Sequence, residues 1–268
     1  ESEIEKLAET LLDEDTKMFE RMRAVFSLRN DRSKEAVKIL CTGFKASSAL
    51  LRHELAYVLG QMQDSHAVPT LIDVLSNENE HVMVRHEAAE ALGHKMLAVY
   101  ARALDLPADF FDRFFTDPMW TTRNAYYPGS PDAEENQFGI SPHRDHGFMT
   151  LLPLSNEPGL QIRTPEGEWI AAEQVDDAII INTGEFMNRW TNGRFIATPH
   201  RVVPPRNDRY SIALFFNPNW DSEAIPLETC ASAANPPQFE PVNIHDYLDW
   251  YIKSNFNKDG GGTRTERA

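Results

Sequence analysis

The chain has few cysteines, no long apolar run and a shortage of basic residues, and each lack excludes a class of protein. Its 268 residues include only Cys41 and Cys230, too few for a disulfide framework or a cysteine-based zinc site. No apolar stretch approaches the ~18–20 residues of a membrane span, and no signal peptide is visible. A net charge of -15 argues against binding to nucleic acid or to an anionic membrane. We therefore expect a cytoplasmic protein that binds neither.

The sequence of the first 93 residues predicts helices and no strands, because its apolar residues recur at helical spacing. The segments LRHELAYVLG (51–60) and VRHEAAEALG (84–93) agree at six of ten positions across an offset of 33 residues. A helix pair repeated at that interval is typical of an α-solenoid, in which each pair buries its apolar face on the next. We expect Pro69 in the first turn of a helix over 67–75.

After residue 94 the pattern changes from helices to short strands. We expect helices at 96–104 and 106–115, strands at 148–154, 159–163, 178–183, 195–203 and 210–216, and a tight turn at 165–168. Many short strands with turns between them are typical of a sandwich or jelly roll. The predicted fold is therefore α+β: a solenoid of HEAT-like helix pairs over 1–93, a jelly-roll domain over 94–256, and a disordered tail over 257–268. Residues 87–96 read as one uninterrupted helix without linker composition, which favours a fusion of two fragments.

Three residues of the second half form a candidate metal site. In SPHRDHGF, His143 and Asp145 stand two residues apart on a β-like segment, so alternation sends both side chains to one face. A third ligand must come from a distant strand, and His200 in ATPHRVV is the candidate. Two histidines and one carboxylate are the facial arrangement that leaves positions open on a non-haem Fe(II). By itself, the pair at 143 and 145 is also compatible with an ordinary surface segment.

Arg209 and Ser211 stand close beyond this motif, in RYSIALFF, where one strand would turn both to the same side. A guanidinium beside a hydroxyl suits bidentate pairing with a buried carboxylate. The alternative is a surface arginine on an edge strand.

Residues 96–256 resemble the isopenicillin-N-synthase-like family of Fe(II)/2-oxoglutarate oxygenases. The matching stretches include RNAYYP, SPHRDHGFMTLL, AIIINTGEFMNRWTNGRFIATPHRVV and RYSIALFFNPN, in the family's order. The resemblance implies a double-stranded β-helix in which His143, Asp145 and His200 bind iron. It also implies that Arg209, Ser211 and Tyr127 hold 2-oxoglutarate. Two departures are Ala125, where plant members often carry Asn, and the absence of the family's N-terminal segment.

The resemblance implies an enzyme that uses Fe(II), 2-oxoglutarate and O2 to hydroxylate or oxidise a small molecule through an Fe(IV)-oxo intermediate. Isopenicillin N synthase itself uses no 2-oxoglutarate, so the Arg-x-Ser pair does not decide whether this chain uses 2-oxoglutarate.

The first half carries two His-Glu pairs, His53-Glu54 and His86-Glu87, at the same position of successive repeats. Stacked repeats place equivalent residues side by side, so the four could bind a metal, or they could be polar helix surface repeated with its module. Residues 1–93 also resemble the N-terminal HEAT-repeat half of deoxyhypusine hydroxylase, a di-iron enzyme, which implies that the four residues are iron ligands. That family uses four such pairs and this chain has two. The alternatives to the oxygenase are therefore a deoxyhypusine hydroxylase or a fragment of it, and a HEAT-repeat scaffold that binds a protein partner.

Overall fold

A computed structural model describes residues 2–134, 136–155, 157–173, 175 and 178–255. The predicted tail at 257–268 lies outside the described residues. Contacts divide the chain into two compact units, Glu1–Val99 with Val175–Ile179, and Tyr100–Gln174 with Ile180–Ala268. No helix of the described residues is long and apolar enough to cross a membrane.

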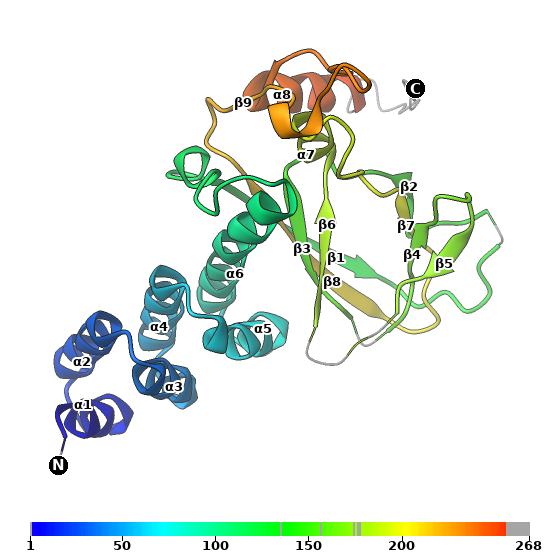
Figure 1. The fold of residues 1–268 in the computed structure, drawn as a ribbon. Helices are drawn as coiled ribbons and strands as arrows, with labels where there is room; N and C mark the ends of the chain where they lie inside the picture. Colours follow the sequence, from blue (N-terminus) through cyan, green and yellow to red (C-terminus); the bar gives the residue numbers. More distant parts are fainter. Residues whose placement is uncertain (1, 135, 156, 174, 176–177, 256–268) are drawn as a thin grey trace. The chain divides into compact units, whose positions relative to one another are not determined.

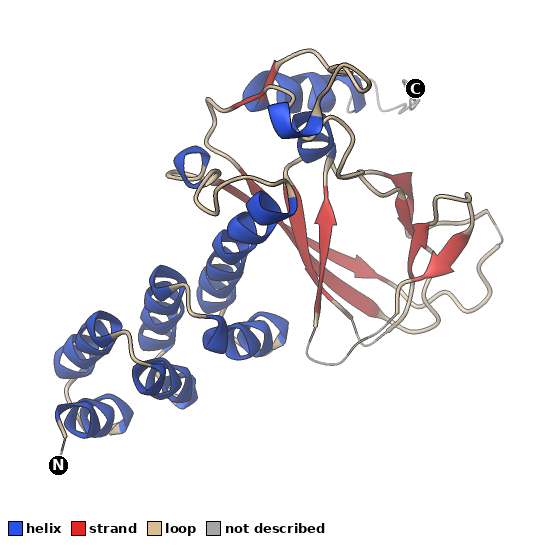
Figure 2. Ribbon diagram, viewed as in Figure 1, coloured by secondary structure: helices blue, strands red, loops and turns tan. Residues whose placement is uncertain are grey.

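The first unit is built from helices that follow one another in pairs (Figures 1 and 2). They are α1 (Glu3–Leu12), α2 (Met18–Asp31), α3 (Lys34–Thr42), α4 (Ala49–Met62), α5 (Val68–Ser76) and α6 (Val82–Ala103). Serine side chains cap α1, α3 and α4 by accepting a backbone N–H of the first turn. Pro69 lies in the first turn of α5, as predicted. The fully buried leucines include Leu28, Leu40, Leu55 and Leu59. The apolar residues that recur at helical spacing in the sequence therefore form the core of the solenoid.

The repeated Arg-His-Glu and Leu-Gly segments lie on α4 and α6. A Cβ at Gly60 would lie 3.0 Å from the Cβ of Ala91, so the two helices approach closely because this position carries no side chain. Arg52 forms two hydrogen bonds to the carboxylate of Glu80, at 2.8 and 2.7 Å, and its repeat equivalent Arg85 donates to the carbonyl of Leu75. The helix predicted to run without interruption over 87–96 is confirmed as part of α6.

The second unit contains two four-stranded sheets, which confirms the predicted jelly roll (Figure 1). The strands are β1 (Met119–Tyr127), β2 (Ile140–His143), β3 (Met149–Pro153), β4 (Leu160–Arg163), β5 (Trp169–Ala171), β6 (Ile179–Thr183), β7 (His200–Val202) and β8 (Arg209–Asn217). One sheet has the order β1-β8-β3-β6 and the other β2-β7-β4-β5. The small strands β9 (Glu223–Ala224) and β10 (Val242–Asn243) pair separately, and the helices are α7 (Glu185–Trp190) and α8 (Ile244–Asn255).

Most predicted strands are confirmed, but two predicted elements are wrong. The segment 106–115 forms turns and a single 3-10 turn, Asp112–Phe114, because its aromatic rings pack in several directions around Phe148 and Trp190. Only residues 200–202 of the strand predicted at 195–203 join a sheet. The backbone before them bonds to side chains instead, since Phe195 donates to the Thr191 hydroxyl and Ile196 accepts from that of Thr183.

Strand β1 was not predicted, although it pairs with β8 over its full length. Its sequence, MWTTRNAYY, lacks the alternation of apolar residues because its middle residues are exposed. The turn predicted at 165–168 is confirmed: it joins β4 to β5, and Gly167 adopts a positive φ of 93°.

An aromatic cluster stabilises the second unit, and Phe148 lies at its centre with no exposed surface. Its ring meets those of Tyr100, Phe111, Phe115 and Trp190 edge to face, at centroid distances of 4.9 to 6.0 Å. Such a site cannot collapse easily around a missing ring.

We expect Phe148→Ala to lower the free energy of unfolding of this unit by about 3–5 kcal/mol, because it leaves a cavity among these rings. Urea unfolding followed by tryptophan fluorescence measures it, since all five tryptophans of the chain lie in the second unit. Ile252→Ala is the control because Ile252 is 56% exposed. Equal losses in the two variants would contradict the assigned core.

Candidate metal centre

Two imidazoles lie side by side because their strands are neighbours. His143 is the last residue of β2, His200 is the first of β7, and the two are register partners in one antiparallel pair. Cross-strand partners project from the same face of a sheet, and the two ring centroids are 4.2 Å apart. The pairing of β2 with β7 therefore joins two histidines that are 57 positions apart in the chain (200 minus 143).

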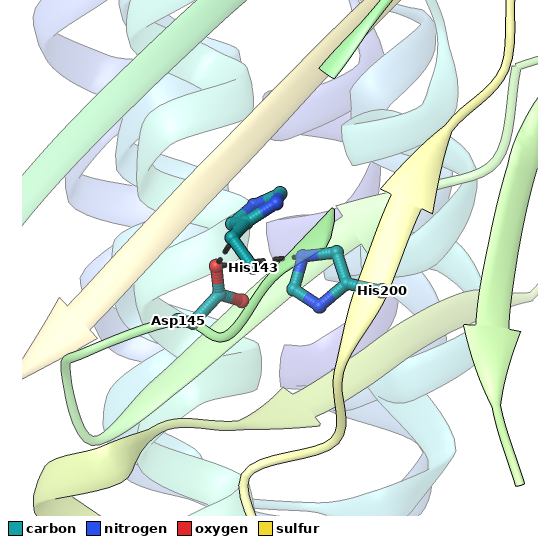
Figure 3. A group of neighbouring side chains, drawn as sticks. All are labelled: His143, Asp145 and His200. Atoms are coloured by element: carbon teal, nitrogen blue, oxygen red, sulfur yellow. Dashed lines mark ion pairs between the residues drawn. The ribbon is translucent and has the colours of Figure 1, made fainter. Parts of the chain in front are cut away.

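Asp145 completes the group from the loop after β2 (Figure 3). Its Oδ1 atom is 3.6 Å from Nε2 of His200 and 4.0 Å from Nε2 of His143. The expectation that residues 143 and 145 share a strand is wrong, because the strand ends at His143. The carboxylate is nevertheless buried, with 6% exposure, and faces both rings.

Hydrogen bonds orient the three side chains. Nδ1 of His143 lies 2.9 Å from the carbonyl of Ser141, and Nδ1 of His200 lies 3.0 Å from the carbonyl of Thr198. A carbonyl only accepts, so each Nδ1 carries a proton, and in the neutral ring each Nε2 then presents a lone pair. The same arrangement, a backbone carbonyl on the far nitrogen, is common for histidines that bind metals.

The Asp145 carboxylate is held through one oxygen. Oδ2 accepts from the hydroxyl of Thr150 and from Nδ2 of Asn182, both at 2.7 Å. This leaves Oδ1 directed at the two imidazoles. Sequence reasoning missed both supporting residues, although Asn182 is a polar residue inside the apolar run AIIINT and could have been noticed for that reason.

The donor set suits a divalent transition metal. The three candidate ligand atoms lie within 4.8 Å of one another, and two nitrogens with one carboxylate oxygen are the set found in mononuclear Fe(II) sites. Two atoms bound to one ion at ~2.1 Å cannot be more than ~4.2 Å apart, and the nitrogen–oxygen distances meet that limit.

A buried guanidinium lies in the same cavity. Arg209, at the start of β8, is 3% exposed; its Nε donates to the carbonyl of Glu157 at 3.1 Å, and its Cζ lies 5.0 Å from the ring centre of Tyr127. Its Nη1 atom is buried and has no hydrogen-bond partner among the described residues. Burial lowers the pKa of Arg209, while Tyr127 and Glu157 oppose that shift. A buried unpaired donor is costly, and this atom is free to donate a hydrogen bond to a ligand in the cavity.

One cavity of about 80 Å³ joins the three candidate ligands to Arg209, Ser211 and Tyr127. Its walls come from both sheets, since β1, β3, β6 and β8 contribute on one side and β2, β4 and β7 on the other. The structure thus brings together all six residues that the sequence selected in this half. Most of the remaining wall is apolar, including Leu152, Leu160 and Ile162.

The four candidate residues of the first unit are arranged differently. His53 lies between two carboxylates, 3.4 Å from Glu54 and 3.4 Å from Glu87, whereas His86 is 3.9 Å from Glu90. Within the described part of this unit, no three ligand atoms of His, Cys, Asp or Glu lie within 4.8 Å of one another. Burial and the nearby Glu90 raise the pKa of Glu87, and His53 opposes the shift.

Two histidines and one aspartate that converge in the cavity of a jelly roll are the arrangement found in non-haem iron proteins with a facial ligand set. More specifically, residues 121–218 match the model of the 2OG-Fe(II) oxygenase superfamily, and residues 4–93 match that of HEAT repeats.

Known relatives are of the two kinds that the two halves predict. The 2-oxoglutarate-Fe(II) type oxidoreductase hxnY of Emericella nidulans is 30% identical over 207 residues, covering 75% of this chain and 59% of that protein. Deoxyhypusine hydroxylase of Candida albicans is 55% identical over 92 residues, covering 34% of this chain and 29% of that protein. A full-length Neurospora crassa protein, solved in complex with alpha-KG and thymine, is 27% identical with a TM-score of 0.61, covering 65% of this chain and 56% of that one. The chain therefore spans less than two thirds of each of these proteins.

We expect Asn182→Ala to weaken metal binding by roughly tenfold, because Oδ2 of Asp145 loses one of its two hydrogen bonds. Titration of the full chain with Co(II), followed by its visible absorption, measures the affinity. Asn188→Ala is the control, since its amide bonds to Glu185 and not to the ligand group. Equal affinities of the two variants would show that Asn182 does not orient the carboxylate.

Proposed function

We propose that the second unit is an Fe(II)/2-oxoglutarate-dependent oxygenase that oxidises or hydroxylates a small molecule. The observation that carries the proposal is the combination, in one cavity, of a two-histidine, one-aspartate group and the unpaired Nη1 of Arg209. The first would bind iron and the second a carboxylate. A relative named as an oxidoreductase, and a solved neighbour that holds alpha-KG, support the same activity for this chain.

His143, Asp145 and His200 would bind the ion through Nε2, Oδ1 and Nε2. Their side chains come from one end of β2, the loop after it and the start of β7, and all three line the cavity. Thr150 and Asn182 both donate to Oδ2 of Asp145, which would keep Oδ1 directed at the ion. With iron, 2-oxoglutarate and O2 bound, the group would supply the oxidising power for breaking a substrate C–H bond.

Arg209, Ser211 and Tyr127 would hold the distal carboxylate of 2-oxoglutarate. Arg209 and Ser211 are two positions apart on β8 and therefore lie on the same face of that strand. Tyr127 is the register partner of Arg209 on β1. A guanidinium fork beside hydroxyl groups pairs with a carboxylate through directed hydrogen bonds. The apolar residues around them exclude water, which strengthens that pairing.

For the first unit we favour a protein-binding role over an independent di-iron hydroxylase. Its likeness to deoxyhypusine hydroxylase covers 29% of that protein, and its four candidate ligands do not gather into one group. HEAT-like helix pairs form extended surfaces that suit protein partners. A net charge of -15 supports the view that neither nucleic acid nor an anionic membrane binds this protein. The cytoplasmic location stays a prediction from the sequence.

Anaerobic addition of Fe(II) and then 2-oxoglutarate to the full chain should produce a weak visible charge-transfer band, because the keto acid would bind the iron through two oxygens. We expect the band to be lost in His143→Ala and kept in His66→Ala, which removes an exposed histidine paired with Asp64. A wild-type chain that binds Fe(II) but develops no band with 2-oxoglutarate would exclude this co-substrate and favour an oxygenase that works without it.

We expect the double variant His53→Ala, His86→Ala to retain the iron content of the wild-type chain. The reason is that the one described three-ligand group lies in the second unit. Elemental analysis after anaerobic loading and desalting measures the content. A second iron in the wild type that disappears in the double variant would favour a metal centre in the helical unit.

A further inference from the structure

Glu157 makes two different kinds of contact with the segment that leads into β8. Its backbone carbonyl accepts a hydrogen bond from Nε of Arg209 at 3.1 Å. Its carboxylate accepts two more from Asn207, one from the backbone N–H to Oε1 at 2.9 Å and one from Nδ2 to Oε2 at 3.1 Å. Asn207 stands two positions before Arg209, so Glu157 binds both the arginine and the backbone that leads to it.

The pairing of Glu157 with Asn207 joins two segments that are distant in the chain. Glu157 lies between β3 and β4, and Asn207 lies in the turn before β8, 50 positions later. Both oxygens of the carboxylate are used, and hydrogen bonds to an ionised acceptor are stronger than those between neutral groups. The donors of Asn207, the backbone N–H first, hold the pKa of Glu157 below its usual value, while its partial loss of water opposes the shift. The carboxylate is therefore ionised at neutral pH and accepts both bonds.

The stem of Arg209 packs against the same segment. A Cβ at Gly159 would lie 3.4 Å from Cδ of Arg209 and 3.3 Å from the carbonyl oxygen of Val203. The backbone N–H of Val203 donates to the carbonyl of Gly159 at 2.9 Å, which fixes Gly159 beside the stem. The segment that holds Glu157 and Gly159 thus contacts both the stem and the Nε atom of the arginine.

The bond to Nε decides which edge of the guanidinium is left for a ligand. A guanidinium binds a carboxylate through two parallel N–H groups, either Nε with one terminal nitrogen or the two terminal nitrogens. Because Nε of Arg209 already donates to Glu157, the terminal nitrogens remain, and Nη1 has no partner among the described residues. The direction of this edge therefore depends on the position of the Glu157 carbonyl.

We infer that Glu157 is a positioning residue for the co-substrate: its bonds to Asn207 fix the carbonyl that orients Arg209 toward the distal carboxylate of 2-oxoglutarate. The inference rests on the proposed function, since it requires that Arg209 binds this carboxylate. Glu157 is not among the described residues that line the cavity, so it acts through Arg209. A fork that is already oriented loses less conformational freedom when its ligand binds, so a loosened fork binds more weakly.

The test is anaerobic titration of the full chain, loaded with Fe(II), with two 2-oxo acids, each followed by its charge-transfer band. 2-Oxoglutarate carries the distal carboxylate, whereas 2-oxobutanoate offers the metal the same keto acid and ends in a methyl group.

Glu157→Ala removes the carboxylate and keeps the carbonyl. Asn207→Asp sets two carboxylates against each other, and Glu157→Gln added to Asn207→Asp supplies an amide that can donate to the new carboxylate. Glu166→Ala is the matched control, since Glu166 is an exposed glutamate of the turn between β4 and β5.

We expect the wild type to bind 2-oxoglutarate more tightly than 2-oxobutanoate. Glu157→Ala and Asn207→Asp should each weaken the binding of 2-oxoglutarate by roughly tenfold, because the bonds between the two residues are lost or opposed by repulsion. The affinities for 2-oxobutanoate and for Fe(II) should not change. Glu157→Gln added to Asn207→Asp should restore most of the affinity for 2-oxoglutarate, and Glu166→Ala should bind it as the wild type does.

Four results would overturn the inference: unchanged 2-oxoglutarate affinity in Glu157→Ala, equal losses for both 2-oxo acids, no recovery in the double variant, or an equal loss in Glu166→Ala. The wild type tests the proposed function separately. A wild type that develops no band, or that binds the two acids equally well, would contradict the proposed role of Arg209 itself.

Discussion

The candidate metal centre depends on how one carboxylate is held. Thr150 and Asn182 both donate to Oδ2 of Asp145, which fixes the side chain and leaves Oδ1 for the two imidazoles. Both donors come from the sheet opposite to that of the histidines, since Thr150 lies on β3 and Asn182 on β6. The ligand group is therefore assembled across the sandwich, and its geometry requires both sheets to be folded.

The second constraint on the site is the cost of a buried charge. Arg209 has little exposure, and its described contacts leave Nη1 without a partner. Such an arrangement costs stability, and a carboxylate bound at this guanidinium would compensate for it.

The two halves of the chain resemble two iron-dependent hydroxylases, yet they arrange their candidate metal ligands in different ways. In the second unit the ligands converge from two strands and a loop, so sequence separation does not limit their proximity. In the first unit the His-Glu pairs project from equivalent helices of successive repeats, α4 and α6, and each helix keeps its own spacing. His53 reaches Glu87 on the neighbouring helix, but His86 lies one turn from Glu90 on its own helix. A solenoid of this length thus offers a row of ligands and not a closed group.

The periodicity of apolar residues and the spacing of motifs in the sequence determined much of the fold and most of the candidate site. The helical repeat, the main strands and the residues of the oxygenase motif follow from local patterns, because apolar period and turn residues act over a few positions. Tertiary structure decided the rest. Strand β1 forms, despite its polar sequence, because it pairs with β8. The segment 106–115 does not form the predicted helix because its aromatic rings pack around Phe148. The support of Asp145 by Asn182 likewise comes from the packing of segments that are 37 positions apart in the chain, which no local pattern encodes.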